Sequence, residues 1–282
     1  MNYRTDLAIE NHELLEEARA KATGYIKKHS QVDEDIAVTD IEIISPAGEK
    51  AFGKKMGRYI TVESNGIIQQ KDGIKERIAK ALAERLKELI PFHYYLKVLV
   101  VGLGNEKVTP DSLGPHTIDK VKITSHLFKI YDADGDFEMG YVSGFNPSVT
   151  GVTGMETADL IEKVVKMVNP EAVIVVDSLA ARNMERMSTT IQISDTGIEP
   201  GAGMGNRRKA INKETLGCKV IAIGVPTVID ARTIILDASG IINEEANYDM
   251  IVTSTDIDEL IKDFSDIISM AINITLHPGI YS

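Results

Sequence analysis

The chain of 282 residues is long enough for one large α/β domain or for two small ones. Its 43% hydrophobic and 26% charged residues are ordinary for a globular protein and argue against disorder. A net charge of −11 disfavours direct nucleic-acid binding, and the single cysteine, Cys218, excludes an internal disulfide. We find no apolar run that predicts a membrane span and no signal pattern, so a cytoplasmic location is expected.

The first third of the chain predicts an α+β portion, residues 7–92. Helical periodicity from about 11 to 29 is followed by two alternating segments, 36–44 and 57–64, which predict strands joined by a turn. Residues 74–90 predict a second amphipathic helix.

From about residue 93 the pattern changes to continuous β-branched runs, at 94–102, 172–180 and 219–225. Strands buried on both faces have this composition, which indicates a mostly parallel sheet covered by helices. The expected helices lie near 112–126, 154–168, 227–240 and 256–274. The sequence therefore predicts a doubly wound, three-layer α/β/α core over residues 93–282, with the N-terminal portion packed on it.

The segment "LVVGLGNEKVTPDSLGP" places glycines at the end of a predicted strand, where a phosphate-binding loop would lie. The Walker pattern is absent, and Val108 stands where the dinucleotide fingerprint has its third glycine. We interpret Gly102, Gly104 and Asn105 as a tight turn that positions Asp111. Taken by itself, Asp111 is better explained as a helix cap.

Asp177 ends the apolar run of "AVIVVDSLAAR" and is expected at the carboxyl edge of a central strand. A cap is one interpretation of it. Alternatively, Asp111 and Asp177 could share one proton, with one acting as base on water and the other as acid, which is chemistry for amide hydrolysis. Two such carboxylates could also hold a divalent metal.

A second motif is the Asp-Thr-Gly triplet at 195–197, which is also found in pepsin-like proteases. Those chains are all-β and carry two copies, so we interpret the triplet here as a chance occurrence. The following "PGAGMGNRR" is a Gly-rich, partly basic loop that could cover a cleft or lie free on the surface.

Four segments together resemble the germination protease family of spore-forming bacteria: "VVGLGNEKVTPDSLGP", "VSGFNPSVTGVTGMETADLI", "VVDSLAARNMERMSTTIQISDTGIEPGAGMGNRR" and "GVPTVIDA". The resemblance extends from "YRTDLAIE" to "LHPGIYS", essentially the whole chain. It implies an atypical aspartic endopeptidase whose proposed catalytic acids correspond to Asp111 and Asp177. The loop with its acid is also similar to hydrogenase maturation endopeptidases, in which the equivalent acids bind metal.

The resemblance further implies small acid-soluble spore proteins as substrates during germination, a self-processing zymogen, a homotetramer, and a location in the forespore or spore core. It implies no cofactor, no membrane and no direct nucleic-acid partner. Residues 3–10 are similar to the family's self-processing site, so cleavage is expected between Asp6 and Leu7. Residues 1–6 would then be a short pro-segment, and 7–282 a single peptidase domain.

An acid on the amino side of the cut requires a cationic pocket, because arginine binds carboxylates in a two-pronged geometry. The candidates are Arg182, Arg186, Arg207 and Arg208. Two other functions stay open: a metal-dependent maturation-type endopeptidase that uses the same acids, and a nucleotide- or nucleoside-binding α/β protein.

Overall fold

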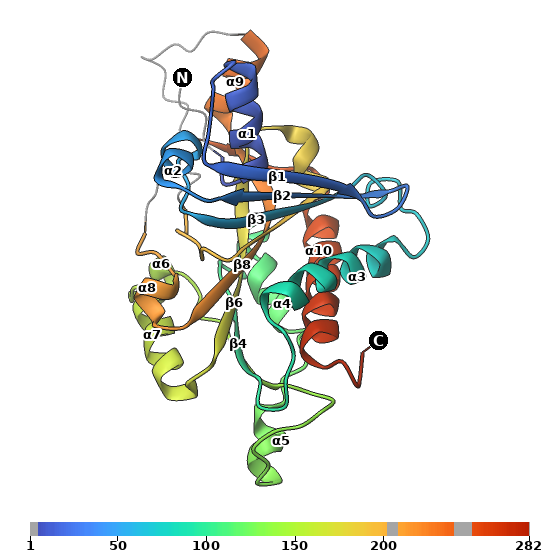
Figure 1. Ribbon diagram of the computed structural model, residues 1–282, viewed down its shortest axis with the longest axis vertical. Helices are drawn as coiled ribbons and strands as arrows, with labels where there is room; N and C mark the ends of the chain where they lie inside the picture. Colours follow the sequence, from blue (N-terminus) through green and yellow to red (C-terminus); the bar gives the residue numbers. More distant parts are fainter. Residues whose placement is uncertain (1–4, 202–207, 240–249, 282) are drawn as a thin grey trace.

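A single mixed sheet runs through the computed structural model, which describes residues 5–201, 208–239 and 250–281 (Figure 1). The strands are β1 (Tyr25–Gln31), β2 (Ile36–Ile43), β3 (Gly57–Ser64), β4 (Lys97–Gly102), β5 (Tyr141–Phe145), β6 (Ala172–Ala181), β7 (Thr190–Ser194), β8 (Lys219–Asp230) and β9 (Ile251–Val252). Within these ranges the order across the sheet is β1-β2-β3-β7-β8-β6-β4-β5, and β9 pairs with β8.

The parallel part of the sheet is its core. β8, β6, β4 and β5 pair in parallel, and β4 and β6 are buried along nearly their whole length. Burial on both faces explains why their sequences are continuous apolar runs instead of alternating ones. The predicted α/β class and its central strands are confirmed.

The N-terminal strands extend this same sheet. β1, β2 and β3 form an antiparallel meander, and β3 then pairs with β7, which pairs antiparallel with β8. The N-terminal α+β portion is therefore joined to the core edge to edge, through backbone hydrogen bonds, in addition to side-chain packing. β7 is a short alternating strand that the sequence analysis did not predict.

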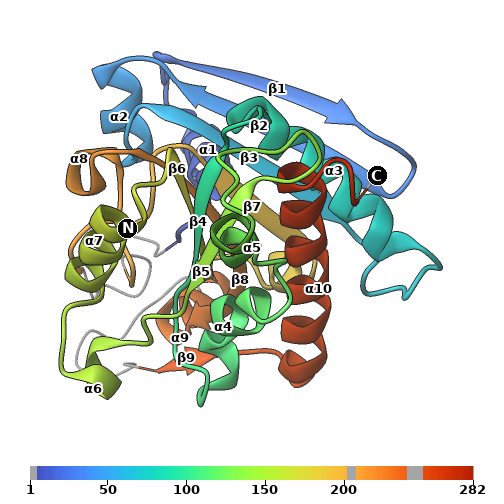
Figure 2. The same ribbon diagram turned by 90° about the horizontal axis from the view of Figure 1, so that it is seen from below.

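Helices cover both faces of the sheet (Figure 2). They are α1 (Ala8–Glu17), α2 (Pro46–Phe52), α3 (Ile74–Leu89), α4 (Leu113–Ile118), α5 (Ser125–Ile130), α6 (Thr150–Thr153), α7 (Thr157–Val168), α8 (Lys213–Leu216), α9 (Ala231–Ser239) and α10 (Ile257–Leu276), with the short 3₁₀ turns η1 (Thr109–Asp111) and η2 (Met184–Ser188). None of the described helices is long and apolar enough to cross a membrane.

Side-chain alternation along β4 assigns the layers. Val98 and Val100 belong to the cluster that contains α3 and α10, whereas Leu99 and Val101 belong to the cluster that contains α7. The predicted three-layer arrangement is confirmed.

Three expected helices are wrong in their bounds. The helix expected over 11–29 ends at Glu17, and positive φ angles at Arg19 (49°) and Gly24 (85°) turn the chain into β1, which pairs with β2. The helix expected from 227 begins only at Ala231, because β8 continues beside β6 to Asp230. The segment 112–126 divides into α4 and the start of α5.

Candidate active site

Asp177 lies where β4 leaves β6. The two strands pair up to Gly102 opposite Val176, and the Leu103 amide donates to the carbonyl oxygen of Val176 at 2.8 Å. Beyond that point β6 continues with β8 alone, so Asp177 is the first residue without β4 beside it. Open α/β sheets bind ligands at the carboxyl ends of their strands, and here it is β4 that ends beside Asp177, while β6 itself continues to Ala181.

The face of β6 that carries Asp177 is apolar on both sides of it. Val173 and Val175 pack against α7, whereas Leu179 and Ala181 pack with the N-terminal segment. Strand alternation puts Asp177 in the same row as these four residues. Its carboxyl group, 6% exposed, is thus the polar position between two apolar clusters.

The loop after β4 brings Asp111 to this strand end. Asp111 ends η1, and its Oδ2 accepts a 2.9 Å hydrogen bond from the Asn105 amide. Gly104 has a φ of 110°, and a Cβ there would lie 1.9 Å from the carbonyl oxygen of Asp111. The Thr227 hydroxyl of β8 donates to the Pro110 carbonyl oxygen at 2.7 Å and fixes the loop from the other side.

Gly102 has a different role from Gly104. A Cβ on Gly102 would lie 2.3 Å from the carbonyl oxygen of Gly114, so its absence lets α4 cross close to the end of β4. Together the glycines form a tight turn. The Asn105 amide, which a phosphate would use, is engaged by the protein's own Asp111.

The charge of Asp111 acts on Asp177. Burial raises the pKa of Asp177 well above its ordinary value, and the nearby charge of Asp111 raises it further. Burial also raises the pKa of Asp111, against the opposing effects of the Asn105 hydrogen bond and the Arg208 charge. Both carboxyls therefore hold a proton to a higher pH than a surface carboxyl does.

The four predicted arginines are placed differently. Arg208 donates to the Thr150 hydroxyl at 3.0 Å, and its charge acts on both Asp111 and Asp177. Arg182 and Arg186 lie at and after the end of β6, beside α1. Arg207 lies outside the described residues.

The N-terminal segment is docked on the end of β6. The Asp6 amide donates to the Ala180 carbonyl oxygen, and the Ala180 amide donates to Asp6 Oδ2, both at 2.9 Å. Leu7 and Ala8 are fully buried. The Asp6 charge also contributes to the raised pKa of Asp177. Gln192, which contacts the Asp6 carbonyl oxygen, and Asp177 both pair with Gly224 of β8, so they flank the same residue of the sheet.

Glu10 anchors this segment through a buried carboxylate, 1% exposed. Its oxygens accept hydrogen bonds from the amides of Arg182 (2.8 Å) and Asn183 (2.9 Å) and from the Thr5 hydroxyl. Arg186 Nε lies 3.8 Å away. Burial raises the pKa of Glu10, and the hydrogen bonds and the Arg186 charge oppose that rise.

Arg182 and Arg186 also contact other acids. Arg182 pairs with Glu17 at 3.1 Å, and Arg186 pairs with Glu13 of α1 and with Glu63 of β3. Glu13 and Glu17 lie on the carboxyl side of the predicted cut, and Glu63 lies on β3.

Two residues that sequence reasoning missed lie beside the Asp6–Leu7 bond. Gln192 of β7, 7% exposed, donates from Nε2 to the Asp6 carbonyl oxygen at 3.1 Å. Lys54 is half-buried, and its ammonium group lies 5.9 Å from the centroid of the Tyr59 ring. Burial lowers the pKa of Lys54, and the charges of Asp6, Glu199 and Glu10 oppose that change. A lone Gln in a strand and a lone Lys in a turn carry no motif, so no signal in the sequence identified either.

The Asp-Thr-Gly triplet has a structural role. Asp195 Oδ1 accepts from the Arg58 amide at 2.8 Å, and the Thr196 hydroxyl donates to the Tyr59 hydroxyl at 3.1 Å. These contacts close the end of the β3–β7 pairing.

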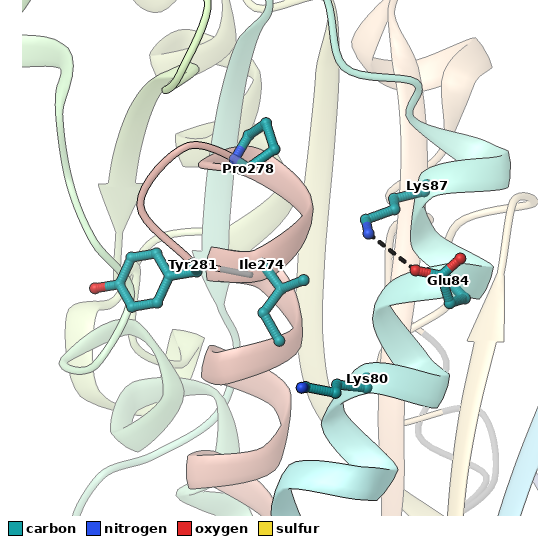
Figure 3. Close-up of a pocket in the computed structure, with 6 residues that line it drawn as sticks. All are labelled: Lys80, Glu84, Lys87, Ile274, Pro278 and Tyr281. Carbon is teal, nitrogen blue, oxygen red and sulfur yellow. Dashed lines mark hydrogen bonds and ion pairs between the residues drawn. The ribbon is translucent and has the colours of Figure 1, made fainter.

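A groove of about 300 Å³ lies away from the acid pair, between α3 and the end of α10 (Figure 3). It is lined by Lys80, Glu84, Lys87, Ile274, Pro278 and Tyr281. Glu84 and Lys87 pair at 2.9 Å, and neither predicted catalytic acid contributes to the lining. Across residues 5–201, 208–239 and 250–281, no group of three or more His, Cys, Asp or Glu side chains is arranged to hold a metal ion.

Comparisons with known proteins agree with the resemblance in the sequence. A family model described as germination protease, Peptidase A25, matches residues 4–245. A germination protease of Caldanaerobacter subterraneus subsp. tengcongensis is 41% identical over 313 aligned residues, covering 99% of this chain and 96% of the relative. One of Bacillus cytotoxicus is 44% identical over 249 residues, covering 83% and 65%.

Among solved structures, a [NiFe] hydrogenase maturation protease, HycI, from Thermococcus kodakarensis KOD1 aligns with 67% of this chain and 99% of its own. The sequence identity is 13% and the TM-score 0.34.

Proposed function

The chain belongs to the germination protease family and is an endopeptidase, and from that premise we propose that Asp111 and Asp177 are its catalytic pair. The observation that supports the proposal is the placement of both acids where β4 leaves β6, with the charge of Asp111 raising the pKa of the buried Asp177. The proposed substrates are small acid-soluble spore proteins in the spore core, and the proposed assembly is a homotetramer.

The proposed chemistry divides two roles between the acids. Asp177, the more deeply buried, holds the shared proton at rest and donates it to the leaving amine. Asp111 is half-buried, accepts the Asn105 hydrogen bond and lies near Arg208, so it is the ionised base that takes a proton from water. Like-charged carboxyls that share one proton provide an acid and a base at the same pH.

We also propose that the N-terminal segment is a substrate of this pair, cut between Asp6 and Leu7. The support is its position on β6, held by Ala180 on one side of that bond and by the Glu10 anchor on the other. A substrate seated in the same register would place a carboxylate in the Glu10 position. Among the four predicted arginines, Arg186 is thus a candidate to bind that carboxylate of the substrate.

Self-processing is the first test. On incubation, the wild-type chain is expected to lose residues 1–6 and to show a new N-terminus at Leu7, measured by intact mass and N-terminal sequencing. Glu16→Gln changes an acid of α1 outside the Glu10 anchor and is expected to process like the wild-type chain. An unchanged N-terminus, with digestion of spore proteins retained, would contradict self-processing alone; loss of both would contradict the endopeptidase assignment of the acids.

Metal removal separates the proposed mechanism from the metal-dependent alternative. After dialysis against a chelator, endopeptidase activity is expected to stay within about twofold of its starting value, because the chemistry is assigned to two carboxyls and a water molecule. Loss of activity that a divalent ion restores would instead favour the alternative in which Asp111 and Asp177 are metal ligands.

A further inference from the structure

Gln192 holds the carbonyl group of the bond that we propose is cut. Its Nε2 donates to the Asp6 carbonyl oxygen at 3.1 Å, and its Oε1 accepts from the Ala8 amide at 2.7 Å. The two contacts fix the orientation of the side-chain amide, because only its NH₂ end can donate to a carbonyl and only its oxygen can accept from an N–H. Gln192 thus spans the Asp6–Leu7 bond, with one hydrogen bond on each side.

We propose that Gln192 is a catalytic residue that stabilises the oxyanion formed on this carbonyl when water attacks it. The inference rests on the proposed function, since it takes Asp6–Leu7 as the scissile bond. During the attack a C–O bond forms between water and the Asp6 carbonyl carbon, and the carbonyl π electrons move onto the oxygen. The Nε2–H group then donates to a negatively charged oxygen, and this hydrogen bond strengthens as the charge develops.

The surroundings of Gln192 suit that role. It is 7% exposed, and it lies on β7, a fully buried strand that pairs with β3 on one side and β8 on the other. Preorganised donors in dry surroundings act more strongly on a developing charge than donors in water. In the proposed mechanism the ionised Asp111 has no proton to donate to the oxyanion, and the proton of Asp177 is assigned to the leaving amine.

A purely structural role for Gln192 is the rival explanation. The Ala8 amide is the first N–H of α1, and Gln192 Oε1 caps it from outside the helix. The cap uses only the acceptor end of the amide, whereas the proposed catalysis uses only the donor end. Substitutions that separate the two ends therefore distinguish the explanations.

The experiment compares Gln192→Glu, which retains the acceptor and loses the donor, with Gln192→Met, a neutral variant of similar length that loses both. Self-cleavage of the full chain is followed by mass, and kcat and KM are measured on a synthetic peptide with the sequence of residues 1–16. In both variants kcat is expected to fall about 100- to 1,000-fold, with KM changed less than about threefold. Both variants lose the donor to the Asp6 carbonyl oxygen, and only Gln192→Met also loses the cap of the Ala8 amide, so the two melting temperatures report the structural contribution separately from kcat.

Thr190→Val is the matched control, since it removes another buried polar group of β7, whose hydroxyl contacts that of Thr189. It is expected to cleave at the wild-type rate. A folded Gln192 variant that cleaves within about threefold of wild type would overturn the proposal; should Gln192→Met fail to fold, Gln192→Glu decides. Absence of a cut at Asp6–Leu7 in the wild-type chain would instead show that the proposed self-processing is wrong.

Discussion

Asp177→Asn and Asp111→Asn are each expected to lower endopeptidase activity about 1,000-fold or more, because each removes a group that transfers a proton in the reaction. The double variant should be no worse than either single one, since acids that work as a pair are strongly non-additive. The measurement is kcat/KM for the cleavage of spore proteins or of the peptide of residues 1–16, together with the rate of self-cleavage.

The pH dependence follows from the raised pKa values. The active form has one proton on the pair, so activity should fall at low pH, where both acids are protonated, and at high pH, where both are ionised. Burial of Asp177 and its closeness to Asp111 move the high-pH limb above the ordinary carboxyl range. In Asp111→Asn the residual activity should lose this bell shape.

In Asp177→Asn, stability at neutral pH should move in the opposite direction to activity. The folded protein binds the Asp177 proton more tightly than the unfolded chain, so this group's contribution to stability declines as pH rises from about 4 through its folded pKa. Asp177→Asn removes that loss and should melt at or above the wild-type temperature at neutral pH. Inactivity of this variant then could not be attributed to misfolding.

Asp195→Asn provides the control for these variants, because Asp195 belongs to the Asp-Thr-Gly triplet and accepts a hydrogen bond from the Arg58 amide. An asparagine retains the accepting oxygen, so full activity is expected. Full activity in Asp111→Asn or Asp177→Asn would refute the acid-pair mechanism, and inactivity of Asp195→Asn would direct attention to the triplet.

The core of the fold could be predicted because its signals are local. Uninterrupted apolar runs identified β4 and β6. The expectation that Asp177 ends its own strand was wrong, because β6 continues beside β8 to Ala181, and it is β4 that ends beside Asp177. The failure of the expected helix over 18–29 has an equally physical cause. Residues there are compatible with a helix, but pairing with β2 and the turn at Gly24 decide in favour of a strand.

The substrate side of the site could not be predicted, since its contacts join distant parts of the chain. Gln192 and Asp6 are 186 residues apart in sequence, and the Glu10 carboxylate binds amides 172 and 173 residues away. Arginine side chains suggested a carboxylate pocket, but only the fold shows that the backbone amides at 182 and 183 bind the Glu10 carboxylate. A single Gln in an alternating strand has no motif that would draw attention to it.

The second large effect is expected at Gly104, where the addition of a single methyl group should disturb the site. In Gly104→Ala the new Cβ would lie 1.9 Å from the Asp111 carbonyl oxygen, and the φ of 110° is unfavourable for alanine. The loop must shift, which displaces Asp111 from Asp177 and frees the Asn105 amide. We expect a loss of about 1–3 kcal/mol in the free energy of unfolding and about 100-fold in kcat.

Gly154→Ala separates strain from displacement. Gly154 has a φ of 72°, also in the left-handed region, but a Cβ there meets nothing within 4 Å. That variant should lose only about 1 kcal/mol, the cost of the left-handed conformation, and retain full kcat. Equal behaviour of the two variants would mean that the turn after β4 does not control the position of Asp111. A selective loss of kcat in Gly104→Ala would instead mean that these glycines serve to bring the two carboxyls together.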